Sequence, residues 1–399
     1  HLCDRRQRQM CIRDRRSDIM SNLRFSLVGK LSIAGDRPNK PAFSDKLLDS
    51  GCNIRELNLQ MKCDKDNFNL QIKSFMSNAK KNSDGSINVD NSIIYSLIKS
   101  EDGKYSTVQF KHKDSDKYID NLAEFKKYVF VDGDDRLECS NTFDYATALY
   151  TTLKSDVYKD KVFRVDGEIE YSNYKNPKTG IENTYTNYNV ERIYLVNDDT
   201  EQKATCTLDV YMTADCIDNT DIEETGSFKL MCYIPQYMSK KKGEFGYYQV
   251  LDYPLNIDKD KQSKKFNALQ KLLTSNFEDN ELCKMGFKCN LINRIKEVDF
   301  DIETMISDEE KELLEFGIIT ESELEAKYGK GQGGRETKME VEGITRGYTT
   351  GAIPVPLTLN ELLSKGDEEL KENKILTSDE NDDLDLFSND DNEDELFDF

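Results

Sequence analysis

The most constraining feature of this chain is a series of short segments in which apolar and polar residues alternate. Two of them carry a glycine near the middle: Gly29 in residues 23–33 (LRFSLVGKLSI) and Gly167 in residues 162–171 (VFRVDGEIEY). Alternation with a period of two places successive side chains on opposite faces of a strand, and an internal glycine marks a bend or a bulge. A chain of 399 residues has enough length to fold such strands into more than one domain.

The alternating segments form two groups, separated by a helical pattern at residues 143–153. The first group holds residues 23–33, 54–63 and 67–76, and the second holds residues 162–171, 185–196, 204–213, 226–235 and 247–257. Five strands of which the first bends at a glycine match the count and order of an OB-fold Greek-key barrel. We therefore predict a mostly β protein with helical additions (α+β) that contains two tandem OB-like five-stranded barrels. A five-stranded β-sandwich is the alternative.

Beyond residue 261 the pattern changes to a helical one. Phe266, Leu269, Leu272 and Leu273 form an apolar stripe, and three capping boxes with glycine terminators follow at Ser307 to Gly317, Thr320 to Gly329 and Thr358 to Gly366. The predicted organisation is a first OB-like domain at 20–140, a second at 141–260, a helical acidic region at 261–366 and a disordered acidic tail at 367–399.

The first residues do not fit this scheme. Residues 1–16 (HLCDRRQRQMCIRDRR) resemble peptides translated from sequencing adapters, so we expect residues 1–19 to be a non-native leader and Met20 to be the initiator. The leader contains six Arg and three Asp. A basic arm that contacts nucleic acid is the alternative interpretation.

The net charge of −21 argues against a protein that coats DNA through charge alone. The acidic residues are concentrated, however. Residues 379–399 hold 11 acidic side chains and no Lys or Arg, and residues 297–325 hold twelve acidic side chains and one Lys. The proposed barrels themselves are therefore much less acidic than the whole chain.

Motifs for catalysis, metals and cofactors are missing from the sequence. The ten Cys include no CxxC pair, and no phosphate loop, dinucleotide loop, zinc-protease motif or nucleophile elbow occurs. We expect no enzyme activity, no metal and no cofactor, with reduced thiols in a cytoplasm and no membrane span. His112 is expected to be a solvated loop residue. A magnesium nuclease built from Asp166, Glu168, Glu170 and Asp209 is a further alternative.

Two loops combine aromatic rings with lysines, as single-stranded nucleic acid requires for stacking and for phosphate contact. In an OB-fold the loops between strands one and two and between strands four and five flank the ligand groove, and we assign these two segments to those loops of the second barrel. The expected single-stranded DNA contacts are Tyr171, Tyr174, Lys175, Lys178, Tyr185, Tyr188, Arg192, Tyr194, Tyr237, Lys240, Lys241, Lys242, Phe245, Tyr247 and Tyr248.

The alternative interpretation is that the tyrosines are ordinary β-formers that pack, and that the lysines form a solvated hairpin tip. Asp166, Glu168, Glu170 and Asp209 are expected to point outward from their strands, where they would repel phosphate. Binding should then follow the loops and avoid that face.

The tail mixes carboxylates with apolar residues and closes on an aromatic residue. The expected partner-binding residues are Asp394, Glu395, Leu396, Phe397, Asp398 and Phe399. A tail that only keeps the protein soluble would need no terminal hydrophobic residues, although that role is the alternative.

Tandem OB-like domains with an acidic tail ending in Phe399 resemble the single-stranded DNA-binding proteins of bacteria and, more closely, of their phages. The resemblance covers the architecture and the last ten or so residues, and the chain departs from the bacterial type in its length and in having no Trp. It implies binding of single-stranded DNA without sequence preference in replication, recombination and repair.

The resemblance further implies that the tail recruits a polymerase, helicase or primase and competes with DNA for the groove. It is consistent with a homodimer in the cytoplasm of a bacterial host. A phage structural or scaffolding protein is the alternative from a different class.

Overall fold

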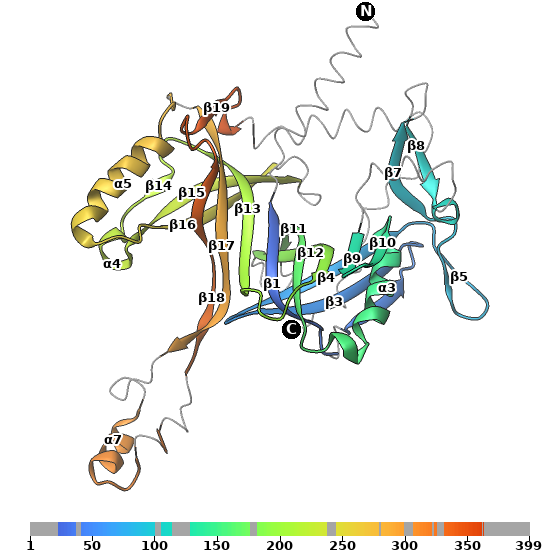
Figure 1. Ribbon diagram of the computed structural model, residues 1–399, viewed down its shortest axis with the longest axis horizontal. Helices are drawn as coiled ribbons and strands as arrows, with labels where there is room; N and C mark the ends of the chain where they lie inside the picture. Colours follow the sequence, from blue (N-terminus) through green and yellow to red (C-terminus); the bar gives the residue numbers. More distant parts are fainter. Residues whose placement is uncertain are drawn as a thin grey trace, which may run out of the picture.

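A large, mostly antiparallel sheet runs through the molecule, and its hydrogen-bonded pairs close on themselves twice (Figure 1). The computed structural model describes residues 23–36, 41–99, 105–113, 128–175, 182–237, 245–278, 281–298, 306–320, 323–324, 331–360 and 362.

The first ring contains five strands that are hydrogen-bonded in the order β1, β3, β4, β12, β11 and back to β1. These strands are β1 (Arg24–Ile33), β3 (Asn53–Cys63), β4 (Asp66–Met76), β11 (Val162–Lys175) and β12 (Glu182–Leu195). The contact between β4 and β12 is parallel and pairs Leu70 with Tyr188. The other four contacts are antiparallel.

The second ring has the same number of strands, in the order β13, β15, β16, β18, β17 and back to β13. They are β13 (Lys203–Met212), β15 (Ser227–Tyr237), β16 (Phe245–Pro254), β17 (Leu282–Val298) and β18 (Gly331–Arg346). Two contacts are narrow: Tyr211 pairs with Tyr233, and Asp252 pairs with Glu340 in parallel. In both rings the only parallel contact joins the third strand to the fifth.

The two rings are joined through β1, which changes its partner at Gly29. On one edge, Arg24 to Val28 pair with β13 of the second ring, and Lys30 to Ile33 pair with β3 of the first. A Cβ atom at Gly29 would lie 2.1 Å from the carbonyl oxygen of Lys62, so only glycine allows β3 to approach this closely. One apolar core is continuous through both rings and includes Phe25, Phe163 and Phe287.

One helix comes after the third strand of each ring, and the two helices lie on opposite sides of the molecule (Figure 1). Helix α3 (Thr142–Leu153) begins at Asn141, whose side chain accepts a hydrogen bond from the Asp144 backbone, and it buries Tyr145 and Leu149. Helix α5 (Lys259–Leu273) buries Phe266 and Leu273 of the predicted apolar stripe.

The remaining elements decorate the two rings. They are β2 (Phe43–Leu47), β5 (Lys80–Lys81), β6 (Ile87–Asn88), β7 (Ile93–Lys99), β8 (Tyr105–Gln109), η1 (Phe110–His112), β9 (Tyr128–Asp132), β10 (Asp135–Cys139), η2 (Asp156–Tyr158), β14 (Ile217–Asp218), α4 (Ile222–Thr225), α7 (Asp308–Glu315) and β19 (Ile353–Val355). No described helix has both the length and the apolar character that crossing a bilayer requires.

The strand pairs correct the predicted grouping. Residues 162–171 do form a strand, but β11 pairs with β1 along Arg24 to Lys30 and therefore belongs to the first ring. The expected division at residues 140 and 141 cuts through that ring. The second ring starts at β13 and is completed by two strands, β17 and β18, that lie in the region expected to be helical.

The error at residues 261–366 has a physical cause. In β17 the side chains of Cys283, Met285, Phe287, Cys289 and Leu291 alternate into the core, which is a strand pattern. The helical signals lie on either side of it, as the apolar stripe of α5 and the capping box of α7. The capping boxes at Ser307 and Thr320 are present as predicted. They begin short helical segments, whereas much of residues 261–366 forms the strands β17 and β18.

The eight described cysteines are free thiols that form no disulfide, and six of them are buried. Burial raises the pKa of the Cys63 thiol to about 12 and that of Cys283 to about 11. Raised pKa values leave little thiolate at neutral pH, so these thiols behave as small core residues.

We expect the Gly29→Ala substitution to destabilise the chain by about 1–3 kcal/mol, because the added methyl group collides with the Lys62 carbonyl. Gly35→Ala is the matched control, since a Cβ there meets no atom within 4 Å, and its effect should stay within about 0.5 kcal/mol. Urea unfolding measures both variants. Equal shifts in the two unfolding free energies would contradict the assignment of Gly29 as the point of partner change.

Candidate functional site

The outer surface of β3, β4 and β12 in the first ring is lined with side-chain amides. Alternation along each strand turns them outward while Leu59, Leu70 and Val190 point into the core. We call this surface the amide face and define it by Gln60, Asn67, Asn69, Gln71, Lys73, Phe75, Tyr185, Asn187 and Asn189. Its amides can donate and accept hydrogen bonds without carrying charge.

Hydrogen bonds link the amide face across neighbouring strands. The Gln71 side chain donates to Asn189 at 3.0 Å, and Asn189 donates to Glu170 at 3.0 Å. Asn187 donates to the Ser172 hydroxyl, also at 3.0 Å. These bonds hold the amide groups in place, so the face is ordered before any ligand arrives.

Two aromatic rings stand exposed on this face. Phe75 and Tyr185 are each 52% exposed. The Lys73 ammonium nitrogen lies 5.0 Å from the centre of the Phe75 ring, and in the described part of the chain it forms no ion pair, although Glu56 is its cross-strand neighbour. A flat ring and a cation that has no described carboxylate partner are the two kinds of group that stack a base and contact its phosphate.

The outer surface of β17 and β18 in the second ring has a different character, because its charges neutralise one another. Lys338 bridges Glu336 at 3.2 Å and Glu340 at 2.7 Å, and Lys288 pairs with Glu342 at 2.8 Å. Burial raises the pKa of Glu336, but the hydrogen bonds from Arg294 and Lys338 outweigh it and hold that pKa below its usual value. These cations are already paired and have little left to offer an anionic ligand.

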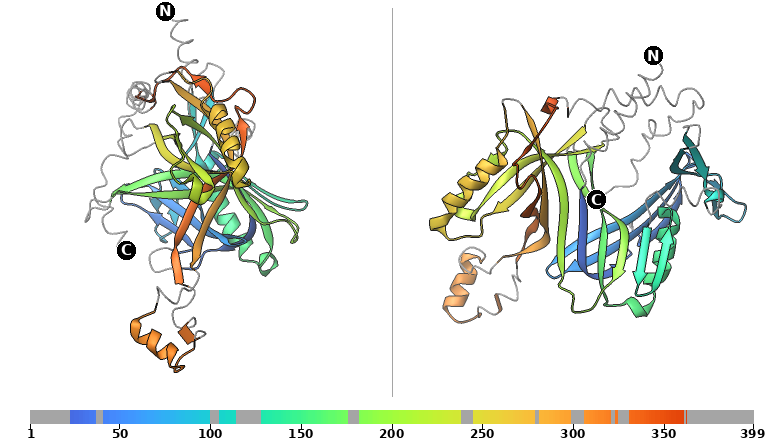
Figure 2. Two further views of the ribbon diagram at one scale, coloured as in Figure 1. Left: turned by 90° about the vertical axis from the view of Figure 1, so that its left-hand side faces the viewer. Right: turned by 45° about the horizontal axis from the view of Figure 1, so that its top comes forward.

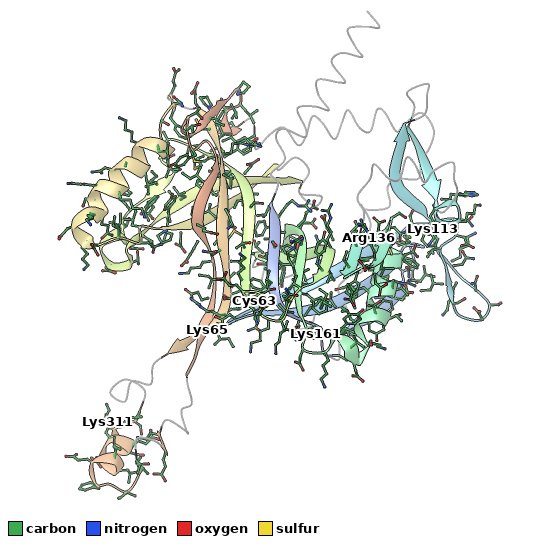
Figure 3. All side chains as sticks on the ribbon, viewed as in Figure 1. Cys63, Lys65, Lys113, Arg136, Lys161 and Lys311 are labelled. Carbon is green, nitrogen blue, oxygen red and sulfur yellow. The ribbon has the colours of Figure 1, made fainter. Side chains whose placement is uncertain are left out.

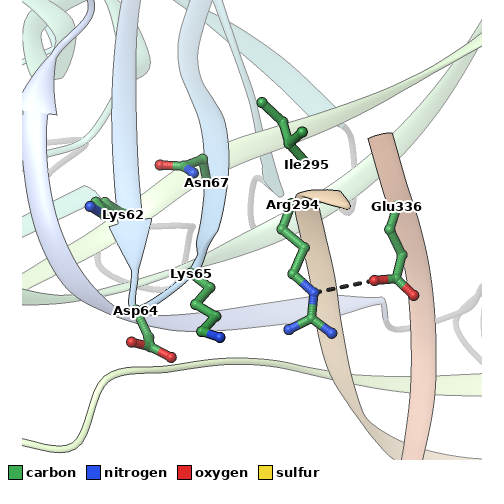
Figure 4. Close-up of a pocket in the computed structure, with 7 residues that line it drawn as sticks. All are labelled: Lys62, Asp64, Lys65, Asn67, Arg294, Ile295 and Glu336. Atoms are coloured by element: carbon green, nitrogen blue, oxygen red, sulfur yellow. Dashed lines mark hydrogen bonds and ion pairs between the residues drawn. The ribbon is translucent and has the colours of Figure 1, made fainter. Parts of the chain in front are cut away.

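A pocket of about 560 Å³ lies where the two rings meet, at the end of the amide face (Figure 4). The turn between β3 and β4 forms one wall, and β17 and β18 form the other. Its lining residues are Lys62, Asp64, Lys65, Asn67, Arg294, Ile295 and Glu336. Figure 3 shows Lys65 at this junction.

Asn293 of β17 fixes the junction between the rings. Its backbone N–H donates to the Asp66 carboxylate at 2.8 Å, and its side-chain amide donates to the Asn67 carbonyl at 2.8 Å. The Nε atom of Arg294 donates to Glu336 at 3.2 Å. Lys62 and Lys65 form no ion pair with any described residue, although the Asp64 carboxylate also lines the pocket.

Two of the tyrosines predicted to contact a ligand are core residues. Tyr171 and Tyr188 are each 6% exposed. The Tyr188 ring packs edge-on against Phe25 at 5.5 Å and Phe68 at 5.4 Å, and burial raises the pKa of its hydroxyl. The alternative interpretation, packing, holds for these two residues.

Other predicted residues lie on the surface of β12. Tyr185 joins the amide face, and Arg192 is exposed further along the strand. Tyr194 is half-buried beneath the Arg164 guanidinium, whose carbon lies 4.3 Å from the ring centre. Of this group, only Tyr185 has an open ring face beside the amides.

For the remaining predicted residues, the structure describes at most the backbone. Strand positions are described for Tyr174, Lys175, Tyr237, Phe245, Tyr247 and Tyr248, while Lys178, Lys240, Lys241, Lys242 and the tail residues 394–399 lie outside the described residues. The segment after Lys175 joins β11 to β12 in the first ring, and the segment after Tyr237 joins β15 to β16 in the second. We expected the two loops to flank one groove. They belong to different rings instead.

The amide face was missed by the sequence prediction, although a signal was present. Residues 67–76 (NFNLQIKSFM) place Asn, Asn, Gln, Lys and Phe at every second position. In a half-buried strand those positions face solvent, and an exposed Phe among amides is unusual there.

The four carboxylates of the nuclease alternative do not form a metal site. Asp166 lies 3.3 Å from Arg164, Glu168 lies 3.2 Å from Arg24, and Asp209 of the second ring is bonded to Lys284 and Arg346. Within the described residues, no group of three or more His, Cys, Asp or Glu side chains could hold a metal ion.

Among solved structures, the chain is similar to two crystal structures of the single-stranded DNA-binding protein from Thermus aquaticus. A deletion variant matches at 11% identity over 71% of this chain and 98% of that chain, with a TM-score of 0.29. The wild-type protein matches at 9% identity over 69% of this chain and 86% of that chain, also with a TM-score of 0.29. No protein-family model and no curated protein matches the sequence.

The placement of the tyrosines predicts their reactivity. Tetranitromethane at pH 8 should nitrate Tyr185 in the folded chain and leave Tyr171 and Tyr188 unmodified, because the last two are buried. Mass spectrometry of tryptic peptides measures the three sites, with the exposed Tyr348 as the positive control. Nitration of Tyr188 as fast as Tyr185 would show that the amide face is placed incorrectly.

Proposed function

We propose that this protein binds single-stranded DNA without sequence preference, along the amide face of the first ring. The observation that carries the proposal is the pair of half-exposed rings, Phe75 and Tyr185, on a face whose Lys73 is not engaged by a carboxylate. Stacking on aromatic rings is insensitive to sequence because every base has a π face. The protein acts as a binding protein and not as an enzyme.

The strand order supports this choice of face. Each ring has five strands and a helix after the third, which we interpret as an OB-type barrel. In that fold the surface of the second and third strands holds oligonucleotides, and here those strands are β3 and β4. The amide face occupies the same strands.

Charge also favours the first ring over the second. The cations on β17 and β18 would have to leave carboxylates before they could meet a phosphate. Lys73 has no such partner in the described chain, so its contact with a phosphate would release counterions at little cost.

The proposed setting is the replication and recombination of phage DNA in the cytoplasm of a bacterial host. Its support is the resemblance of the architecture and of the acidic tail ending in Phe399 to phage single-stranded DNA-binding proteins. In this proposal the tail recruits a polymerase, helicase or primase through residues 394–399.

We expect Phe75→Ala to weaken binding of a fluorescent poly-dT oligonucleotide by about 1–3 kcal/mol, which is roughly 5- to 150-fold in Kd. The reason is the loss of one stacking surface from the amide face. Fluorescence anisotropy at 50 mM and 200 mM salt measures the effect.

Tyr348→Ala is the control, because it removes an exposed aromatic ring from the second-ring side of the chain. It should leave the Kd within about twofold, since surface substitutions away from a site change little. Absence of any oligonucleotide binding by the unmodified chain at low salt would overturn the proposed function. Equal effects of the two variants would overturn the choice of face.

Removing residues 379–399 should raise the affinity for poly-dT and abolish partner binding. The segment carries 11 acidic residues and no basic ones, so it competes with DNA for cationic side chains. The same anisotropy assay on the truncated chain tests the competition. An unchanged affinity would mean that the tail does not compete.

A further inference from the structure

A small helical unit at the end of the β17–β18 hairpin has a surface that plays no part in the proposed DNA binding. We call it the knob and define it as residues 306–320 together with 323 and 324. Figures 1 and 2 show α7 standing apart from both rings, beyond the hairpin. The pairs Glu297 with Gln332 and Val298 with Gly331 continue the hairpin past the inter-ring pocket toward the knob.

The knob is locally well built. Ser307 and Glu310 form a complete capping box at the start of α7, and Gly317 ends it with a φ of 65°. Ile306 and Leu324, on either side of the helix in sequence, are buried. The cap and the glycine terminator are local interactions that fix both ends of α7.

The outer surface of the knob is apolar and acidic at once. Phe316 is 74% exposed and Ile318 is 66% exposed, with Leu313 partly exposed close by. Exposed acids surround them: Asp308, Glu309, Glu312 and Glu315. Large apolar side chains gathered on a charged surface mark an interaction site, and this one would suit a partner that is both basic and apolar.

The inter-ring pocket has that chemistry. Basic side chains outnumber acidic ones in its lining by three to two, since Lys62, Lys65 and Arg294 stand beside Asp64 and Glu336. Lys62 and Lys65 have no described ion-pair partner, and Ile295 stands at the rim 56% exposed. Its volume of about 560 Å³ falls within the usual range for ligand-binding pockets. A phosphate chain would use the lysines but would gain nothing from Ile295, whereas a Phe flanked by carboxylates would use both.

We propose that the knob of one copy of this chain docks into the inter-ring pocket of a second copy, with Phe316 against Ile295 and Glu312 and Glu315 toward Lys62 and Lys65. Knob and pocket are different surfaces, so the contact is head-to-tail and links copies into an open row. The hairpin carries the knob away from the pocket at its own base, which favours contact with a neighbouring copy.

The acidic tail is the competing occupant, because it repeats the pattern of the knob. The knob reads Glu312-Leu313-Leu314-Glu315-Phe316, and the chain ends Glu395-Leu396-Phe397-Asp398-Phe399. The helix of the knob is formed before it binds, so docking costs it little conformational entropy.

The test is the association state of the full chain without DNA, so its outcome is independent of the proposed function. Sedimentation velocity between 1 and about 100 μM should show a mass that rises with concentration, and the rise should weaken in high salt. Phe316→Ala should weaken association at least roughly tenfold, as the loss of a buried aromatic anchor does. Val157→Ala is the control, because Val157 is 68% exposed but belongs to η2, outside the knob.

Charge reversal identifies the two surfaces. A chain with Glu312→Lys and Glu315→Lys should not self-associate, and neither should a chain with Lys62→Glu and Lys65→Glu. A mixture of the two should associate again, because the reversed knob fits the reversed pocket. A monomeric unmodified chain, or a mixture that stays monomeric, overturns the proposal. Loss of association after removal of residues 379–399 alone would also overturn it and assign the pocket to the tail.

Discussion

The structure depends on a single strand whose hydrogen bonds serve both rings. β1 pairs with β11 along one edge and divides the other edge between β13 and β3. The division is possible because Gly29 has no side chain to separate it from Lys62. Through this strand and Asn293, the rings share one sheet and one core, so the amide face and the inter-ring pocket keep a fixed relation.

Charge is distributed so that each surface has a distinct chemistry. The second ring pairs its lysines with glutamates along β17 and β18, and the first ring presents amides with Lys73 beside Phe75. The excess of acid lies at the end of the β17–β18 hairpin and in the last 21 residues. A net charge of −21 therefore says little about any one surface of the molecule.

Strand positions could be predicted because alternation is a local signal, and β1, β3, β4 and β11 lie where the pattern placed them. Their partners could not, because alternation reports which face is buried and not which strand lies alongside: Arg24 meets Glu168, 144 residues later. Tyr185 and Tyr188 lie three positions apart on one strand, so their side chains point to opposite faces. One ring therefore reaches the surface and the other reaches the core. The strong caps at Ser307 concealed the strands on either side of α7.

The shared strand also sets an order of events during synthesis. The hydroxyl of Thr205 bonds to the carbonyl of Ser26, 179 residues earlier, so β1 leaves the ribosome long before β13 exists. At about 5–20 residues per second, that strand waits roughly ten to forty seconds with an open edge. An unpaired edge invites association with other chains. β1 therefore keeps part of its edge open until β13 has been made, and this edge needs protection while the chain grows.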